Sequence, residues 1–256
     1  MKVTVINEPF VPDFCRTQRW AARTRGRVLR PPDWLAYATA VLENSGMDVE
    51  LYDFPARRWG KEELRCLIRE KRPGYAVLDS TTPSIYSDID CARIVKEEAG
   101  SAVIMVGPHA SALPEETLKD AAGAVDVVVR GEYDYAVRDV IACLDAGEDL
   151  AGVPGIAYRR GEQVVHTGPR PLIEDLDRLP FPAWHQLEVM SYFDGGKLYP
   201  YFDLISGRGC PFRCSFCLWP QVMHGRRYRL RSPGNVVDEM ENDLRLWPRL
   251  RRGEIF

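Results

Sequence analysis

The sequence predicts an α/β fold, a doubly wound parallel five-stranded sheet over residues 1–148, followed by the start of a second strand–loop–helix unit. Three observations support the sheet. Five short apolar runs recur along this part of the chain, segments with apolar residues at helical spacing separate them, and the runs are continuously apolar rather than alternating with polar residues. Continuous apolar strands between amphipathic helices indicate a parallel sheet that is covered on both faces.

The expected strands are residues 2–6, 49–52, 75–78, 102–106 and 125–129. A long loop follows the first strand and contains six arginines without an acidic residue among them, namely Arg16, Arg19, Arg23, Arg25, Arg27 and Arg30. Such a run can steer an anionic ligand, but it is more typical of a solvated segment. We favour the solvated segment.

Five helices are expected between and after these strands. Asp33 is placed to cap the first, which carries Leu35, Ala38 and Leu42 and ends at Gly46. The others are expected around residues 64–68, 85–95, 114–116 and 133–144.

The bulk composition describes an ordinary globular chain. It has 256 residues, 45% of them hydrophobic, and a formal net charge of -3, so no nucleic-acid partner is indicated. No apolar run approaches the roughly 20 residues that cross a bilayer, and the first is too short for a signal peptide, which predicts the cytoplasm. We interpret the scattered Cys15, Cys66, Cys91 and Cys143 as structural, the last three as small buried residues of helices.

Small and hydroxyl side chains follow the third, fourth and fifth strands. They lie in Ser80-Thr81-Thr82, in Gly107-Pro108-His109-Ala110-Ser111 and in Arg130-Gly131-Glu132. Ligands of doubly wound sheets bind at the carboxyl ends of the strands, where such loops let a large flat ligand approach the backbone. The alternative is that these residue types are simply common in such loops.

The remaining chain divides into a connector over residues 149–200 and a second unit over residues 201–256. The connector contains a predicted hairpin, 155–158 with 163–166, and a proline-punctuated acidic segment, 172–187. In the second unit a strand over 201–206 enters a cysteine-rich loop, and Ser232-Pro233 begins a helix. The apolar side of that helix is expected to hold Val236, Val237, Met240, Leu244 and Trp247.

Cys210, Cys214 and Cys217 are spaced by four and three residues in a glycine- and arginine-rich loop. Three thiolates on one loop can converge on a soft metal centre. Structural zinc needs a fourth ligand, and downstream only His224 is available, so zinc is the weaker interpretation. A [4Fe-4S] cluster with three cysteine ligands keeps one iron open.

With Phe216, these cysteines resemble the signature Cys-x-x-x-Cys-x-aromatic-Cys of the radical S-adenosylmethionine (SAM) superfamily. The resemblance implies that the three cysteines hold a [4Fe-4S] cluster and that SAM binds the open iron through its amino and carboxylate groups. One-electron reduction then cleaves SAM to a 5′-deoxyadenosyl radical. Phe216 is implied near the adenine of SAM, although it is equally suited to packing over the cluster.

Together with this motif, the first domain resembles the cobalamin-binding domain that precedes the radical SAM partial TIM barrel in one class of these enzymes. The resemblance implies cobalamin contacts at Ser80, Thr81, Thr82, Gly107, Pro108, His109, Ala110, Ser111, Gly131 and Glu132. The Asp-x-His-x-x-Gly motif that supplies a lower axial histidine elsewhere is absent, so we expect the cobalt to lack a protein histidine. We interpret His109 as a wall residue.

Residues 225–233 contain several arginines that could meet the SAM carboxylate or an anionic substrate, although such a run is more often a solvated loop face. With Thr81-Thr82-Pro83-Ser84 and Glu132-Tyr133-Asp134-Tyr135, this run is similar to the subgroup associated with hopanoid lipid biosynthesis.

The resemblance implies radical C-methylation of an unactivated carbon in a small-molecule or lipid substrate, with ring contraction or another rearrangement as the nearest alternative. It also implies an external one-electron reductant such as flavodoxin or ferredoxin. A non-catalytic cobalamin carrier or sensor is the alternative from another class. Because residues 201–256 suffice for one barrel unit and the start of a second, we expect the chain to be an inactive N-terminal fragment of a longer protein.

Overall fold

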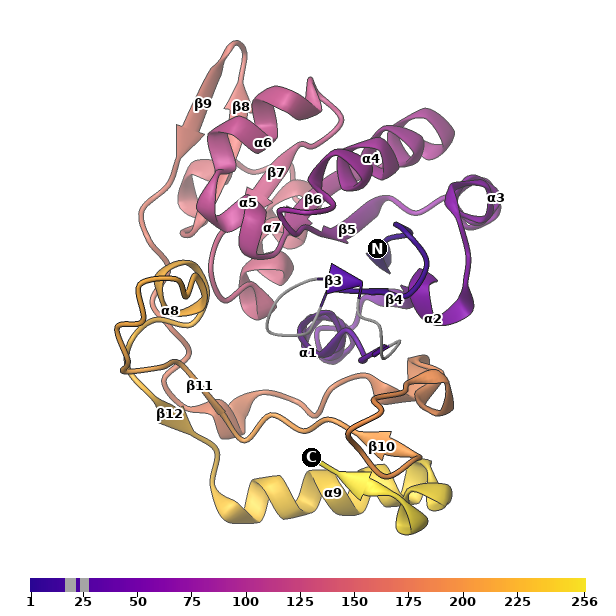
Figure 1. Cartoon of the computed structure of the whole chain (residues 1–256). Coiled ribbons are helices and arrows are strands. Elements are labelled where there is room, and N and C mark those ends of the chain that lie inside the picture. Colours follow the sequence, from indigo (N-terminus) through magenta and orange to yellow (C-terminus); the bar gives the residue numbers. More distant parts are fainter. Residues whose placement is uncertain (17–21, 24–27) are drawn as a thin grey trace.

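The computed structural model describes residues 1–16, 22–23 and 28–256 (Figure 1). Its centre is a seven-stranded sheet in the order β4-β1-β5-β6-β7-β8-β9. The five predicted strands are β1 (Lys2–Asn7), β4 (Asp48–Asp53), β5 (Tyr75–Asp79), β6 (Ala102–Val106) and β7 (Val127–Val129). They pair in parallel throughout, which confirms the predicted doubly wound sheet.

Helices cover both faces of this sheet. They are α1 (Asp33–Asn44), α3 (Lys61–Lys71), α4 (Ile85–Ala99), α6 (Pro114–Ala121) and α7 (Asp134–Asp145). Side chains of consecutive strand residues point to opposite faces, so Val5 and Ile104 pack into a core with α1 and α7. Ile6 and Met105 pack into a second core with α3, α4 and α6.

The predicted hairpin forms, as β8 (Ile156–Arg160) and β9 (Gln163–His166), but it does not belong to a free connector. β8 adds to the sheet antiparallel to β7, with Val128 opposite Ala157. A strand that follows α7 can bury its apolar residues only against an existing edge, and β7 offers that edge. Short elements complete this part: α2 (Phe54–Arg57), α5 (Pro108–Ala112), η1 (Leu150–Gly152), β2 (Phe14–Cys15) and β3 (Ala22–Arg23).

The proline-punctuated segment that follows is an extended strap with three single-turn helices, η2 (Leu176–Arg178), η3 (Trp184–Gln186) and η4 (Val189–Ser191). Trp184, Val189 and Tyr192 are buried in the core of α1 and α7. The backbone N–H of Ala183 donates to the Ala36 carbonyl at 3.0 Å. The strap therefore fixes the second unit to the first.

The second unit contains β10 (Tyr201–Phe202), β11 (Gly207–Arg208), α8 (Trp219–Val222), β12 (Arg229–Leu230), α9 (Pro233–Leu246), η5 (Pro248–Arg252) and β13 (Glu254–Ile255). β10 and β13 pair in parallel, and β11 pairs antiparallel with β12. The strand predicted over 201–206 is thus shorter. The Ser232 hydroxyl accepts from the Asn235 N–H at 3.2 Å and caps α9, as expected.

Three local predictions were wrong. Asp33 does not cap α1: it is the first helical residue, and Pro32 holds the cap position without a side-chain bond. Cys66 is exposed rather than buried. The buried residues of α9 are Glu239 and Asp243, while Val237 on the expected apolar side is 51% exposed. The strand expected from residue 125 begins at Val127.

No helix within the described part of the chain is long and apolar enough to cross a membrane.

Candidate cofactor site

The loops after β5, β6 and β7 meet at one edge of the sheet, because parallel neighbouring strands end on the same side. Ser80 joins two of them: its hydroxyl donates to the Val106 carbonyl at 2.6 Å and accepts from the Ala110 N–H at 3.1 Å. Thr81 also hydrogen-bonds internally, to the Ser84 hydroxyl at 2.7 Å. The hydroxyls of Ser80 and Thr81 therefore stabilise the loops at this edge. Of Ser80, Thr81 and Thr82, only Thr82 is exposed to solvent.

Gly107 lies at the tightest point of this edge. Its φ is +98°, and a Cβ atom there would lie 2.6 Å from the Ser80 carbonyl oxygen and 2.2 Å from Asp79 Oδ1. A side chain is therefore excluded both by the backbone conformation and by the close approach of the β5 loop. This glycine lets the two loops touch.

We expect Gly107→Ala to destabilise the protein more than Gly123→Ala. Gly123 has a similar φ of +94° but nothing within 4 Å of a Cβ atom, so alanine there should cost only the left-handed conformation, about 1–2 kcal/mol. At Gly107 the crowding should add about 1–3 kcal/mol. Urea unfolding of the two variants measures the difference, and equal losses would show that the loops can relax apart.

The segment predicted as a loop after β6 is the one-turn helix α5, which begins at Pro108. His109 in this turn is 8% exposed, and its Nδ1 lies 3.2 Å from the Thr82 hydroxyl. Burial lowers the pKa of His109. On the other side of α5, the Ser111 hydroxyl contacts Met223 Sδ at 3.5 Å and accepts from the Gly131 N–H at 3.0 Å.

Glu132, which follows β7, is the centre of a buried ion-pair network. Its carboxylate accepts from Arg229 at 2.9 and 2.5 Å, from His224 Nδ1 at 3.1 Å and from the Ile173 N–H at 2.9 Å. Burial by itself raises the pKa of Glu132, but the hydrogen bonds from His224, Arg229 and Ile173 outweigh it and lower the pKa to about 2. The carboxylate is therefore ionised, and its partners are Arg229 and His224 of the second unit and Ile173 of the connector.

A second buried pair lies beside the first. Arg208 donates to both carboxylate oxygens of Asp134 at 2.7 and 3.0 Å, and its guanidinium lies 4.8 Å from the Trp34 ring centroid. Arg208 is two residues before Cys210. The two pairs thus attach both ends of the cysteine-containing segment, residues 208–229, to the edge of the sheet.

The interpretation of residues 225–233 as a solvated loop face was wrong for two arginines. Arg229 and Arg231 are buried, the second in an ion pair with the buried Glu239 of α9. Arg227, which pairs with Glu174, is 60% exposed and fits the solvated interpretation. The burial of Arg229 and Arg231 could not be predicted from the sequence, because the acidic residues that neutralise them lie on other elements.

The arginine-rich loop after β1 is also not a uniformly solvated segment. Arg16 is buried. Its guanidinium donates to the Asp88 carboxylate at 2.6 Å and to the Glu8 backbone carbonyl at 2.6 Å. Arg30 is half-buried and pairs with Asp194 at 2.9 Å. Arg19, Arg25 and Arg27, and the side chain of Arg23, lie outside the described residues. Burial raises the pKa of the neighbouring Asp79 to about 7, against the opposing effect of Arg16.

The three motif cysteines lie on one irregular loop. Cys210 and Cys217 are half-buried and Cys214 is exposed, with the Cys217 N–H donating to the Cys214 carbonyl at 3.2 Å. Phe216 is 64% exposed. Within the described ranges, no three His, Cys, Asp or Glu side chains lie close enough together to hold one metal ion. The three thiols have the chemistry of cluster ligands, and binding a cluster would require the loop to bring them closer together.

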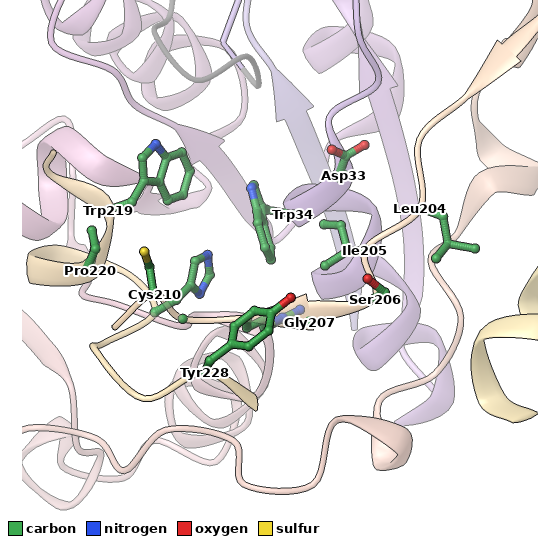
Figure 2. A pocket seen from close by; sticks show the side chains of 13 residues that line it. Asp33, Trp34, Leu204, Ile205, Ser206, Gly207, Cys210, Trp219, Pro220 and Tyr228 are labelled. Carbon is green, nitrogen blue, oxygen red and sulfur yellow. The ribbon is translucent and has the colours of Figure 1, made fainter. Parts of the chain in front are cut away.

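A cavity of about 410 Å³ lies between the N-terminus of α1 and the segment from β11 to α8 (Figure 2). Trp34, Trp219 and Tyr228 stand around it, and Cys210 reaches it from the cysteine loop. Asp33, Ser206, Arg208 and His224 add charged and polar side chains to its lining. A smaller cavity of about 10 Å³ lies beyond Trp34 and Trp219, against Asp79 and Gly107.

Residues 27–141 match the B12 binding domain family. The chain is 30% identical over 211 residues to an uncharacterized methyltransferase of Pyrococcus horikoshii, covering 82% of this chain and 45% of that protein. It is 34% identical over 221 residues to the anaerobic magnesium-protoporphyrin IX monomethyl ester cyclase of Rubrivivax gelatinosus, covering 82% and 38%. The chain therefore spans less than half the length of these relatives.

The hopanoid C-3 methylase of Methylococcus capsulatus is 30% identical over 154 residues, 59% of this chain and 28% of that protein. Among solved structures, the radical S-adenosylmethionine methyltransferase TsrM of Kitasatospora setae, with cobalamin and a [4Fe-4S] cluster bound, superposes with a TM-score of 0.69 at 20% identity. The superposition covers 94% of this chain and 45% of that structure. At this identity the likeness establishes the fold.

Proposed function

The chain belongs to the radical SAM proteins that carry a B12-binding domain, and from this premise we propose that it serves in radical C-methylation with cobalamin, SAM and a [4Fe-4S] cluster. The observation that carries the proposal is the pair of buried ion pairs, Glu132–Arg229 and Asp134–Arg208. They hold the cysteine loop against the B12-binding domain. When bound, the cluster supplies the electron that cleaves SAM, and cobalamin supplies the methyl group.

For cobalamin, the loops after β5, β6 and β7 fit a flat ligand in their chemistry. Gly107 lets the two loops approach closely at this edge, and Pro108 and Ser111 add small, partly exposed side chains. Ala110 is fully buried in the core of α3, α4 and α6, so its side chain is not available for this contact. Met223 now covers Ser111 and Gly131, so a contact at those two positions requires α8 to move aside. Because the Glu132 carboxylate is occupied, we assign this residue's cobalamin contact to its backbone.

We expect the cobalt to have no protein imidazole ligand. None of the four histidines has an aspartate two residues before it, so the motif that supplies an axial histidine is absent. Nδ1 of His109 lies against the Thr82 hydroxyl, which suits a wall residue. The measurement is the EPR spectrum of cob(II)alamin bound to the protein, prepared with ordinary and with ¹⁵N-labelled histidine. Identical spectra are expected. A nitrogen splitting that changes with the label would contradict this prediction.

For the cluster, Cys210, Cys214 and Cys217 are the proposed ligands, and Phe216 is proposed to contact SAM. Two observations suit this assignment: the thiols are reachable from solvent or from the cavity, and the residues around them form no regular element that would prevent the loop from closing. The chain's own part in the reaction is to orient these groups beside the cavity that Cys210 lines.

Because residues 201–256 suffice for one barrel unit and the start of a second, the 256-residue chain by itself is expected to be inactive. The test is therefore SAM cleavage, under strong reductant, by a reconstituted protein in which this chain is joined to the remaining units of a radical SAM partial barrel. We expect 5′-deoxyadenosine to form, and we expect a product labelled with CD₃ when the methyl group of SAM carries deuterium and extracts supply candidate substrates. Tight binding of both cofactors without any 5′-deoxyadenosine would favour a non-catalytic carrier or sensor.

Radical cyclisation or rearrangement is the second candidate, and the 34% identity to a cyclase favours it. Under this alternative 5′-deoxyadenosine forms but no product contains the CD₃ label. The same experiment therefore separates the two reactions.

A further inference from the structure

A chain of four buried polar side chains connects the loop after β5 to the loop after β1. The Ser84 hydroxyl lies 2.7 Å from the Thr81 hydroxyl and donates to Asp88 Oδ2 at 2.7 Å. Asp88 Oδ1 accepts from the Arg16 guanidinium at 2.6 Å. Each of the four residues is at most 4% exposed. We call Thr81, Ser84, Asp88 and Arg16 the relay.

The relay uses Ser84 in an unusual way. Ser84 occupies the N-cap position of α4, where a serine hydroxyl usually accepts from a backbone N–H of the first turn and stabilises the helix. Its side chain makes no such capping bond, because the hydroxyl turns toward Asp88. The link to Asp88 therefore forms in place of a local helix cap.

The placement of Asp88 is also unfavourable by itself. Asp88 is completely buried, and its neighbours Ile85 and Ile89 on α4 belong to the core that α4 shares with α3 and α6. A buried charge is tolerated where a partner neutralises it, yet replacing such an ion pair by apolar residues is often neutral or stabilising. The stability of α4 therefore does not by itself account for the relay.

Arg16 is held in place at its own end of the relay. Its guanidinium also donates to the Glu8 backbone carbonyl at 2.6 Å and lies 3.9 Å from the Glu8 carboxylate. Glu8 directly follows β1, which pairs with β5 in the sheet. The relay thus fixes the loop after β5 to the end of the neighbouring strand.

The opposite end of the relay reaches the proposed cobalamin contacts. Thr81 lies between Ser80 and the exposed Thr82, whose hydroxyl is 3.2 Å from Nδ1 of His109. A shift of Thr81 would therefore move Thr82 and its contact with α5. Asp88 has no exposed surface, so it can act on a ligand at this edge only through the loop.

We propose that Asp88 and Arg16 are positioning residues, which hold the loop after β5, through Ser84 and Thr81, in the conformation that contacts cobalamin. This inference rests on the function proposed above, because it takes cobalamin as the ligand of the loop. The relay acts before the ligand arrives, so the order of the loop in the cofactor-free protein depends on it as well. An ion pair that served the fold alone would leave the affinity of the folded protein for cobalamin unchanged.

Ser84→Ala tests the relay, because it removes the link to the loop and leaves the pair between Arg16 and Asp88 in place. The first measurement is amide hydrogen exchange in the cofactor-free protein, followed by NMR. The N–H groups of residue 84 and His109 donate to the Thr81 and Ser80 carbonyls at 3.1 and 3.3 Å. Relative to their intrinsic rates, both should exchange roughly 3- to 10-fold faster in the variant. The second measurement is titration with hydroxocobalamin, whose affinity should fall by a similar factor.

Two substitutions on the same helix are the controls. Ser87→Ala makes the same chemical change in the first turn of α4, but the Ser87 hydroxyl bonds to the Pro9 carbonyl at 3.5 Å, outside the relay. It should keep the wild-type exchange rates and affinity. Ile94→Val removes one buried methyl group and destabilises the domain without touching the relay, so its affinity for hydroxocobalamin should also stay at the wild-type value.

Asp88→Asn tests the centre of the relay. Arg16 can only donate, so the asparagine oxygen has to face it and the amide N–H₂ has to face Ser84, which can then no longer donate to residue 88. Exchange should quicken and affinity should fall as in Ser84→Ala. Because both changes break the same link, the double variant should bind hydroxocobalamin no more weakly than the weaker single variant.

Unchanged exchange and affinity in Ser84→Ala would overturn the proposal, even if Asp88→Asn does not fold. Equal losses in Ser84→Ala and Ser87→Ala, or effects of Ser84→Ala and Asp88→Asn that multiply in the double variant, would overturn it too. A wild-type chain without affinity for hydroxocobalamin would count against the proposed function. The exchange rates are measured without the cofactor and would still decide whether the relay holds the loop, so the two failures can be told apart.

Discussion

Glu132→Ala is expected to lower the free energy of unfolding by about 3–5 kcal/mol, the usual loss when one partner of a buried ion pair is removed. The variant leaves Arg229, whose side chain is 4% exposed, without its carboxylate, and it frees Nδ1 of His224. Urea unfolding at neutral pH measures the loss. Because the same carboxylate joins the two units, limited proteolysis should also cut residues 208–229 sooner.

The exposed pair Arg227–Glu174 supplies the control. It joins the same loop to Glu174 of the connector, next to Ile173, but its side chains are 60% and 68% exposed, so Glu174→Ala should cost at most about 1 kcal/mol. Replacing both buried partners, as Glu132→Leu with Arg229→Met, should recover part of the loss, because no charge is then left uncompensated. Similar losses from Glu132→Ala and Glu174→Ala would show that the network is not buried in solution.

The effect of Glu132→Ala should also depend on pH. The pKa of Glu132 in the folded protein, about 2, lies below the value of roughly 4.3 for an unfolded glutamate. The unfolded state therefore takes up the proton first as the pH falls. The stability that Glu132 contributes is complete above about pH 4.3 and is lost as the pH falls toward 2, so wild type and variant should converge in acid.

Replacing Cys210, Cys214 and Cys217 together by alanine is expected to abolish iron binding. After anaerobic reconstitution the wild-type chain should hold about four irons and show the visible absorbance of a [4Fe-4S] cluster, and the triple variant should show neither. Elemental analysis and absorption spectroscopy measure both. Cys210 and Cys217 are only half-buried and Cys214 is exposed, so the substitutions should leave the fold intact.

Cys66→Ala is the matched control, since Cys66 is exposed on α3, a helix on the far side of the sheet from α1. It should keep all of its iron. Stoichiometric zinc without iron–sulfur absorbance in the wild type would defeat the cluster assignment, and equal iron loss from Cys66→Ala would mean that the binding is nonspecific.

The parts of this protein that follow from the sequence are those encoded by neighbouring residues. The alternation of apolar strands with amphipathic helices predicted the parallel sheet, and the strand boundaries agree within about two residues for β1, β4, β5, β6 and β7. The spacing of Cys210, Cys214 and Cys217 lies within one loop, and Ser232-Pro233 predicted the start of α9. In each case the information is periodicity or a local motif, which a short window contains.

What only the tertiary structure decided is which charges are buried and where the second unit sits. Arg229 and Glu132 are 97 residues apart, Arg208 and Asp134 are 74 apart, and Arg16 and Asp88 are 72 apart. In the sequence Arg16 and Arg229 each belong to a basic run that is typical of a solvated face, and Arg208 lies in the glycine- and arginine-rich cysteine loop. A buried arginine is tolerated only where folding brings a carboxylate to it, and that depends on strand order and on the path of the strap rather than on any local pattern.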